Sequence, residues 1–360
     1  MTPKLRPLLR GLPAYQPGRR AAPGQDLARL ASNETPYPPL PSVVDAVARA
    51  VAGGNRYPDP HAAELTAALA HKHGVAEDQV AVGCGSVSLV QQLVQISTDP
   101  GAEVVYAWRS FEAYPGFVKV AGARPVPVPL RNYEHDLYAM ADAVTDATGL
   151  VLLCSPNNPT GPALRADDVR SFLGRIPPDL LVVLDEAYAE FVDDPAAVDG
   201  RALLANHSNL AVLRTFSKAY GLAGLRVGYC LAGSAATTAA LRQVAVPFSV
   251  SIPAQAAALA SLAAEGELLP RLADVRRERE PLRTALHELG YDVPPSQGNF
   301  LWLATGEDTL RVAARFDEAG VLTRPFDGDG IRVTVTTAAD SARVIAAARA
   351  ALVPSRAPAG

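Results

Sequence analysis

The sequence has 360 residues, which is enough for two domains or for one large and one small domain. Hydrophobic residues make up 49% and charged residues 19%, and glycine and proline are dispersed without a period, so a collagen-like or disordered chain is excluded. The formal net charge of -4 provides no cationic field, so neither nucleic acid nor an anionic membrane is expected as a partner.

Apolar runs and cysteine spacing indicate the compartment. The longest apolar runs are shorter than the ~20 residues that span a bilayer, and proline and arginine interrupt the amino-terminal stretch, unlike in a signal peptide. We therefore expect a cytoplasmic protein. Cys84, Cys154 and Cys230 are widely spaced and form no CxxC motif, so we expect reduced cysteines and no metal site.

The amino-terminal part is predicted to be an arm followed by two helices. Residues 1–30 contain many breaks and little periodicity, which is typical of an arm that lies on another part of the molecule. A helix is predicted over 42–54 with Ser42 as its cap, and a second over 59–74, which ends in a glycine.

Short runs rich in valine, leucine and isoleucine then recur, separated mostly by polar or alanine-rich segments of helix length. The predicted strands are 78–83, 102–107, 124–130, 149–154, 179–185, 209–216 and 225–232. Such alternation indicates a mainly parallel sheet covered by helices on both faces. We predict that residues 31–250 form a large α/β domain.

The pattern changes after about Ser251. A long helical stretch follows, and its charge run RRERE at 276–280 is interpreted as a solvated helix face. A helix from about Asp308 is also predicted, together with strands at 299–304, 321–326 and 331–335. These elements predict a smaller α+β domain over residues 251–360.

Four motifs lie at or just after the carboxyl ends of predicted strands, where open α/β sheets bind their ligands. They are GCGSVS at 83–88, SPNNPTG at 155–161, LDEAY at 184–188 and TFSKAYGLAGLR at 215–226. In the first, a strand runs through a glycine turn into a helix, so the amides of Gly85, Ser86 and Val87 are predicted donors for a phosphate. A dinucleotide site is disfavoured because the next strand ends at Tyr106 and Ala107 and not at an acidic residue.

Two of the motifs place charged groups at the ends of apolar strands. Asp185 ends the run LLVVL, where a carboxylate needs a cationic partner. Lys218 follows a second apolar strand, beside the hydroxyl residues Thr215 and Ser217, and Arg226 lies eight positions later. Desolvation and nearby cations neutralise a lysine in such a place, as Schiff-base formation requires, and an arginine suits a phosphate. Together these residues indicate a lysine directed at a phosphorylated carbonyl compound.

The segments SPNNPTG, LDEAY and TFSKAYGLAGLRVGY resemble the signatures of fold-type I, pyridoxal-phosphate-dependent aminotransferases. The similar branch contains the histidinol-phosphate and aromatic amino acid aminotransferases, and the resemblance extends from LASNETPY at 30–37 to IRVTV at 331–335. It implies an aspartate-aminotransferase-like α/β fold, with a mainly parallel sheet in a large domain and a smaller α+β domain. It also implies pyridoxal 5′-phosphate as the cofactor and a homodimer with shared active sites.

The resemblance also implies a role for each matching residue. Lys218 would be the Schiff-base lysine and the acid–base catalyst, and Asp185 would pair with the pyridine nitrogen. Tyr188 and Asn158 would hydrogen-bond the phenolic oxygen of the cofactor, and Phe111 would stack on its ring. The cofactor phosphate would be held by Gly85, Ser86, Val87, Thr215, Ser217, Arg226 and, from the second subunit of the dimer, Tyr57.

Substrate binding is assigned by the same resemblance. Arg332 would bind the substrate carboxylate as a bidentate pair, and Asn33, Tyr15 and Arg324 align with other pocket positions. For Arg324, an ion pair with a surface carboxylate is the alternative. A pocket formed by Tyr15, Trp108, Phe111 and Tyr114 would accept an aromatic ring.

Three segments, GCGSVSLVQQL, WRSFEAYP and VTVTT, are similar to actinobacterial aromatic aminotransferases. Val87 and Ser88 stand where the histidinol-phosphate branch usually carries an acidic pair. This implies transamination of aromatic L-amino acids with a 2-oxo acid such as 2-oxoglutarate. Histidinol phosphate remains an alternative, because Arg332 and Arg324 would equally hold a phosphate. A decarboxylase or lyase of the same fold would keep the lysine and the aspartate but would not need Arg332.

Overall fold

The computed structural model describes residues 3–9, 12 and 26–352. The α-helices in chain order are α1 (Pro41–Val51), α2 (Ala63–His73), α3 (Ser86–Ser97), α4 (Tyr114–Ala121), α5 (Leu137–Asp142), α6 (Ala166–Arg175), α7 (Ala235–Val244), α8 (Ile252–Ala263), α9 (Glu265–Glu288), α10 (Thr309–Glu318) and α11 (Ala338–Ala351). Short 3₁₀ turns are η1 (Pro7–Leu9), η2 (Glu77–Gln79), η3 (Ala189–Phe191), η4 (Gly200–Asn206), η5 (Ala223–Leu225) and η6 (Gly306–Asp308).

In the described part of the chain, a seven-stranded sheet has the order β2-β8-β7-β6-β5-β3-β4. Its strands are β2 (Val80–Gly83), β3 (Glu103–Trp108), β4 (Arg124–Pro129), β5 (Thr148–Cys154), β6 (Leu181–Asp185), β7 (Leu210–Thr215) and β8 (Gly228–Ala232). Every neighbouring pair from β7 to β4 is parallel, whereas β8 runs antiparallel to both β2 and β7. The prediction of an α/β fold around a mainly parallel sheet is confirmed.

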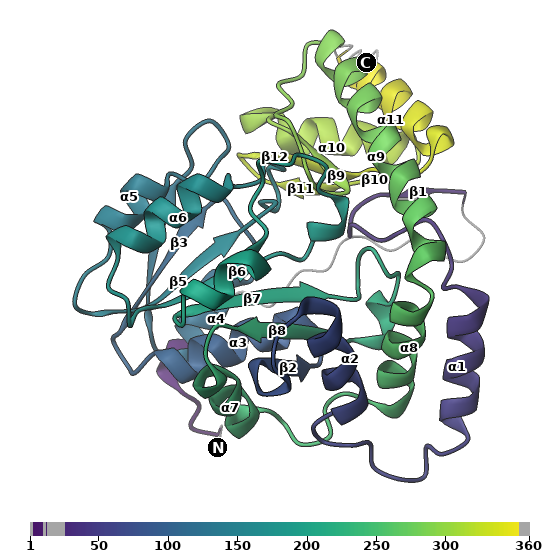
Figure 1. Ribbon diagram of the computed structural model, residues 1–360. Helices are drawn as coiled ribbons and strands as arrows, with labels where there is room; N and C mark the ends of the chain where they lie inside the picture. The colour runs from purple at the N-terminus through teal and green to yellow at the C-terminus, as the bar shows by residue number, and fades with distance from the viewer. Residues whose placement is uncertain (1–2, 10–11, 13–25, 353–360) are drawn as a thin grey trace.

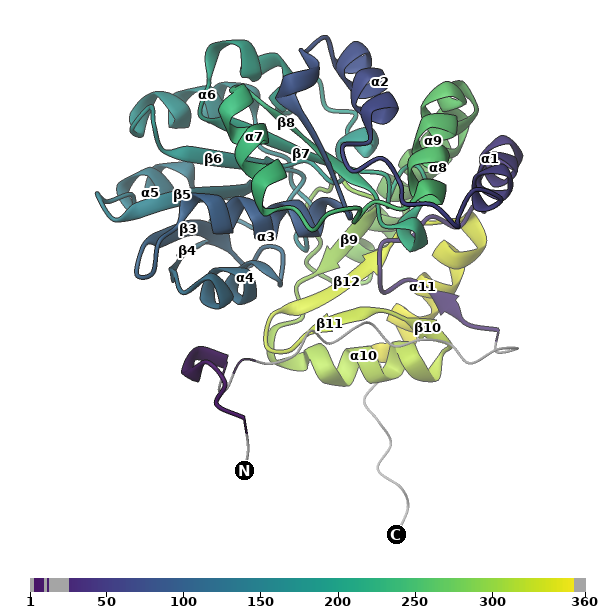
Figure 2. The ribbon, with the colours of Figure 1, turned by 90° about the horizontal axis from the view of Figure 1, so that it is seen from below.

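Both faces of this sheet are buried, which explains why its strands are apolar without strict alternation. Along β3, Val104 belongs to one hydrophobic cluster and Val105 to the other, because successive side chains point to opposite faces. The cluster around Val104 includes residues of α3, α4 and α7, and the cluster around Val105 includes residues of α2, α5 and α6. Figure 2 shows α3 and α4 on one side of the sheet and α2 and α6 on the other.

A smaller antiparallel sheet has the order β11-β12-β9, with β9 (Phe300–Leu303), β11 (Arg324–Phe326) and β12 (Gly330–Thr334). Together with α10 and α11 it forms the upper part of the molecule in Figure 1. The single strand predicted over 321–326 is wrong. Residues Val321–Leu322 form β10, which pairs in parallel with β1 (Ala28–Arg29), and only the residues after Thr323 join β12.

The amino-terminal segment lies on elements from the other end of the chain. Besides the pairing of β1 with β10, α1 packs along α8, as Figure 1 shows. The division into an arm over 1–30 and domains over 31–250 and 251–360 stays a prediction.

The predicted N-cap of the first helix, Ser42, is wrong by two residues. Helix α1 begins at Pro41, and Leu40 is its extended N-cap without a side-chain cap, so Ser42 lies inside the first turn. Proline suits the first helical position because its φ is already fixed and its missing amide proton has no acceptor there. None of the described helices is both long and apolar enough to cross a membrane.

Candidate active site

A cavity of about 240 Å³ lies where the carboxyl ends of the parallel strands meet the smaller sheet. Each of the four sequence motifs contributes to its wall: Ser86 begins α3, Asn158 follows β5, Asp185 ends β6 and Lys218 follows β7. The smaller sheet contributes Arg332 on β12. The structure therefore brings together in one cavity residues that are far apart in the sequence.

Asp185 is buried at the end of β6. Its two oxygens accept hydrogen bonds from the Tyr114 hydroxyl at 3.0 Å and from the Ala187 amide at 3.2 Å. Burial raises the pKa of Asp185 to about 6, although these two hydrogen bonds oppose the increase. The cation expected beside this carboxylate is not among its side-chain partners in the described residues, so the group can bind a cationic ligand.

Lys218 points into the same cavity, and its Nζ donates to the Ser32 carbonyl at 2.8 Å. Burial, together with the positive charges of Arg332 and Arg226, lowers the pKa of Lys218 to about 7. The amine is therefore more readily uncharged near neutral pH than that of a solvent-exposed lysine. The geometry places a nucleophilic amine and a buried carboxylate on the same cavity, as an imine-forming site requires.

The amino end of α3 and Arg226 form an anion-binding corner. Ser86 and Val87 begin the helix, so their amides have no acceptor within it. The prediction for Gly85 is corrected here: its amide already donates to the Gly83 carbonyl at 2.7 Å. Gly85 has a positive φ of 76°, and a Cβ there would come within 2.4 Å of the Arg226 guanidinium.

The remaining predicted phosphate ligands lie beside this corner. Arg226 adopts a left-handed conformation, with φ 58°. Its guanidinium donates to the Ser217 hydroxyl at 3.4 Å and to the Ala223 carbonyl at 2.9 Å. The Thr215 hydroxyl accepts from the Ser217 amide at 3.1 Å, which orders the turn that carries Lys218.

Tyr188, Asn158 and Phe111 also line the cavity. The Tyr188 hydroxyl accepts from Asn33 Nδ2 at 3.0 Å, and burial raises the pKa of Tyr188 to about 12, so the phenol remains protonated. Asn33 itself is buried and does not line the cavity, so its contact with the ligand site runs through Tyr188. The prediction that Asn33 belongs to the substrate pocket is therefore corrected to a supporting position.

Two arginines from the smaller sheet face the cavity. Arg332 donates to Asn158 Oδ1 at 2.5 Å and to the Ala31 carbonyl at 2.7 Å. Arg324 donates to both carboxylate oxygens of Glu112, at 2.7 and 2.9 Å. Of the two possibilities for Arg324, the structure thus shows the ion pair, but the partner carboxylate also lines the cavity.

Some predicted residues lie elsewhere. Tyr114 and Trp108 do not line the cavity, because Tyr114 is buried against Asp185 and Trp108 packs against Tyr106 and Arg109. The predicted aromatic pocket therefore retains only Phe111 among the described residues. Tyr57 is 80% exposed, stacks on Phe248 with ring centroids 4.6 Å apart, and does not contact this cavity. Tyr15 lies outside the described residues.

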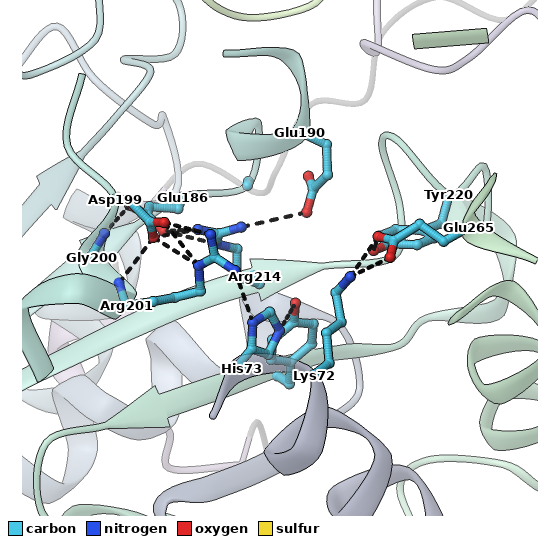
Figure 3. Close-up of polar contacts among 12 residues, drawn as sticks. Lys72, His73, Glu186, Glu190, Asp199, Gly200, Arg201, Arg214, Tyr220 and Glu265 are labelled. Carbon is cyan, nitrogen blue, oxygen red and sulfur yellow. Dashed lines mark hydrogen bonds and ion pairs between the residues drawn. The ribbon is translucent and has the colours of Figure 1, made fainter. Parts of the chain in front are cut away.

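Figure 3 shows a cluster of charged side chains that includes the sequence neighbours of two cavity residues, Asp185 and Thr215. We call it the Arg214 cluster; it comprises Arg214, Glu186, Glu190 and Asp199. The Arg214 guanidinium donates to Glu186 Oε2 at 2.8 Å and lies 3.7 Å from Glu190 and 3.3 Å from Asp199. Glu186 follows Asp185 directly, and Arg214 precedes Thr215. The Arg214 cluster thus connects the carboxyl ends of β6 and β7, which position Asp185 and Lys218.

A second group of contacts in Figure 3 joins α2 to the strands and to α9. His73 contacts the Tyr229 hydroxyl at 2.9 Å, and burial together with Arg214 lowers the pKa of His73 to about 3. Lys72 pairs with Glu265, which also accepts from the Tyr220 hydroxyl at 2.8 Å. Tyr220 lies two residues after Lys218. These contacts therefore connect the loop that carries Lys218 to α2 and α9.

The sequence does not predict the contacts that Glu112, Tyr114 and Arg214 make around the site. The sequence predicts Tyr114 in an aromatic substrate pocket, whereas in the structure its hydroxyl donates to Asp185. Glu112 and Arg214 carry no local signal. Their partners Arg324 and Glu186 stand on other strands or loops, so only the fold brings them together.

Comparison with known proteins gives consistent matches over nearly the full length. Residues 25–348 match the family Aminotransferase class I and II. An aromatic amino acid aminotransferase of Thermobifida fusca (strain YX) is 54% identical over 348 residues, which cover 96% of this chain and 97% of that protein. A protein of the same name from Streptomyces coelicolor is 53% identical over 336 residues, covering 93% of each.

Solved structures show the same architecture. Histidinol-phosphate aminotransferase from Sinorhizobium meliloti in complex with pyridoxal-5′-phosphate has a TM-score of 0.87 and 30% identity, and the match covers 97% of each chain. A mutant of Thermus thermophilus aspartate aminotransferase has a TM-score of 0.82 at 24% identity, covering 97% of this chain and 99% of that one. The second likeness concerns the fold alone.

Proposed function

The chain belongs to the class I and II aminotransferases, and we propose that it transfers the amino group of aromatic L-amino acids to a 2-oxo acid such as 2-oxoglutarate. The family predicted from the motifs is confirmed. The observation that carries the proposal is the presence of Lys218, Asp185 and Arg332 on one cavity, in a chain about half identical to proteins named for aromatic substrates.

The cofactor is pyridoxal phosphate, and the cavity residues fit it. The buried carboxylate of Asp185 suits a protonated ring nitrogen, because no cation among the described side chains pairs with it. The phosphate group suits the amides of Ser86 and Val87 and the guanidinium of Arg226. Gly85 has no Cβ, and this absence leaves space for the Arg226 guanidinium. When bound, the cofactor supplies a ring that stabilises negative charge on the α carbon of the substrate.

The residues of the chain have separate tasks in this proposal. Asp185 holds a proton at the ring nitrogen, which its carboxylate does best while ionised. Lys218 attaches the cofactor and then moves a proton at the α carbon of the substrate, for which a pKa of about 7 suits both uptake and release. Tyr188 and Asn158 orient the phenolic oxygen of the ring, and Arg332 binds the α-carboxylate of the amino acid.

The test is a set of single-turnover reactions of the purified holoenzyme with phenylalanine, tyrosine, tryptophan and histidinol phosphate. The proposal expects an aromatic amino acid to remove the visible absorbance of the bound cofactor fastest. One equivalent of the matching 2-oxo acid should form, without carbon dioxide. Faster reaction with histidinol phosphate would refute the aromatic assignment, and carbon dioxide release would refute transamination.

Histidinol phosphate is the second candidate, because a solved structure 30% identical to this chain is a histidinol-phosphate aminotransferase. Two cavity arginines, Arg324 and Arg332, would suit the phosphate of that substrate. The single-turnover reactions with the aromatic amino acids and histidinol phosphate distinguish the two functions.

We also propose a homodimer with shared active sites in the cytoplasm. Tyr57 supports the dimer, because an exposed ring beside the partly exposed Phe248 suits burial against a second subunit. The free cysteines Cys84, Cys154 and Cys230 are consistent with a reducing compartment. Sedimentation of the holoenzyme as a monomer at micromolar concentration would refute the dimer.

A further inference from the structure

Tyr114 begins α4 and contacts two residues of the cavity wall, although it does not line the cavity itself. It is only 1% exposed. Its hydroxyl donates to Asp185 Oδ2 at 3.0 Å, and its ring lies edge-on against the Phe111 ring, with centroids 5.4 Å apart and an interplanar angle of 87°. Asp185 and Phe111 are the two residues assigned to the cofactor ring, so one buried side chain supports both of them.

The carboxylate of Asp185 is held at both of its oxygens. One oxygen accepts from the Tyr114 hydroxyl, and the other accepts from the Ala187 amide at 3.2 Å. The terminal torsion of an aspartate side chain is soft, so hydrogen bonds of this kind decide the orientation of the carboxylate plane. Ala187 contributes a backbone amide from the turn after β6, whereas Tyr114 contributes a side chain from another helix.

The direction of the hydrogen bond between Tyr114 and Asp185 follows from the two groups. Burial and the neighbouring charge of Asp185 raise the pKa of Tyr114 well above its usual range, so the phenol keeps its proton. An ionised carboxylate only accepts, and the hydroxyl therefore donates to it. This bond favours the ionised form of Asp185, which burial and the adjacent Glu186 oppose. Without the hydroxyl, the Asp185 carboxylate would take up a proton more readily.

We propose that Tyr114 is a positioning residue, whose hydroxyl orients the Asp185 carboxylate and keeps it ionised, so that the proton they share resides on the ring nitrogen of the cofactor. This inference rests on the proposed function, because it requires Asp185 to face that nitrogen. A protonated ring accepts electrons from the α carbon of the substrate better than a neutral ring does. Tyr114 thus acts through Asp185 and touches no reacting atom.

Tyr106 provides a matched control from the same group of aromatic residues. It stands on β3, is 2% exposed, and packs its ring against the Tyr114 ring with centroids 6.2 Å apart. In the described part of the chain, Tyr106 is neither a hydrogen-bond partner of Asp185 nor a lining residue of the cavity. Tyr106→Phe and Tyr114→Phe each remove one hydroxyl from a buried tyrosine, but only the second changes the contacts of Asp185.

The experiment records the ¹⁵N resonance of the ring nitrogen in holoenzymes that carry ¹⁵N-labelled pyridoxal phosphate, at neutral pH and without substrate. This resonance distinguishes a protonated from an unprotonated ring nitrogen and does not depend on turnover. The wild type and Tyr106→Phe should show the protonated nitrogen. Tyr114→Phe should lower the ratio of protonated to unprotonated nitrogen about tenfold, which corresponds to ~1.4 kcal/mol, because Asp185 loses a hydrogen bond to its ionised form.

A second pair of variants tests whether the hydroxyl acts through the carboxylate. Asp185→Asn removes the charge and gives the reference resonance of an unprotonated ring nitrogen. Adding Tyr114→Phe to Asp185→Asn should leave that resonance unchanged, because the group through which the hydroxyl acts is already absent. The double variant also guards against misfolding of Tyr114→Phe, since it contains no buried carboxylate at position 185 that loses a partner.

The inference would be overturned by a wild-type resonance in Tyr114→Phe, by an equal change in Tyr106→Phe, or by a further change in the double variant. A wild type whose resonance already coincides with that of Asp185→Asn would instead refute the proposed pairing of Asp185 with the cofactor. The failure of this inference and the failure of the proposed function are therefore distinguishable.

Discussion

Replacing Arg214 by methionine tests whether the Arg214 cluster holds the two strand ends of the active site. The Arg214 side chain is 8% exposed and that of Glu186 is 1% exposed. Their shortest contacts are 2.6 and 2.8 Å, and the second oxygen of Glu186 accepts from the Gly200 amide at 2.7 Å. After Arg214→Met, Glu186 remains buried without its cationic partner.

The expected decrease in the free energy of unfolding follows from this burial. Removing one partner of a buried ion pair destabilises a protein by about 3–5 kcal/mol. The unfolding entropy of a 360-residue chain is about 0.76 kcal/mol/K, at about 2.1 cal/mol/K per residue. The melting temperature should therefore fall by about 4–7 °C. The decrease in melting temperature should be smaller at pH 5 than at pH 8. Burial already raises the pKa of Glu186 and loss of Arg214 raises it further, so at the lower pH the buried carboxyl group takes up a proton and carries no unpaired charge.

The assay is thermal unfolding followed by far-ultraviolet circular dichroism, at fixed protein concentration and saturating pyridoxal phosphate. Arg170→Met is the control, because Arg170 forms an exposed ion pair with Asp167 within α6, and such pairs contribute only about 0.3–0.5 kcal/mol. The double variant Arg214→Met with Glu186→Met should recover much of the stability, since an apolar pair of similar volume replaces the ion pair. A single variant within about 1 °C of the wild type would refute this reasoning.

Three further predictions concern the cofactor and the substrate. The pKa of Lys218 is lowered to about 7, and only the uncharged amine attaches pyridoxal phosphate to the apoenzyme. The rate of attachment should therefore rise about tenfold with each unit of increasing pH up to pH 7 and stay constant above it; a stopped-flow rate independent of pH would contradict this. Gly85→Ala should weaken cofactor affinity about tenfold or more, because its Cβ would meet Arg226, whereas Gly74→Ala, with a similar positive φ and no atom within 4 Å, should leave that affinity unchanged in an equilibrium titration. Arg332→Ala should raise KM for phenylalanine at least about tenfold while the Kd of the cofactor changes less than about twofold, and an unchanged KM would place the substrate carboxylate elsewhere.

The sequence by itself determined the sheet and the position of the site within it. The apolar strand runs, and the polar residues that follow them, are visible in the local pattern, so the sequence alone predicts Asp185 and Lys218 at strand ends. The carboxyl ends of parallel strands lie at one edge of a sheet, and for that reason the four motifs meet in one cavity.

Only the tertiary structure decided which side chains pair. Tyr114 meets Asp185, Arg324 meets Glu112, and Arg214 meets Glu186 across separations of 71, 212 and 28 residues. No local propensity encodes such partners, because each contact depends on strand order, register and the path of a connecting loop. The same reason explains why the run over 321–326 divides between two sheets, although its residues have the composition of one strand.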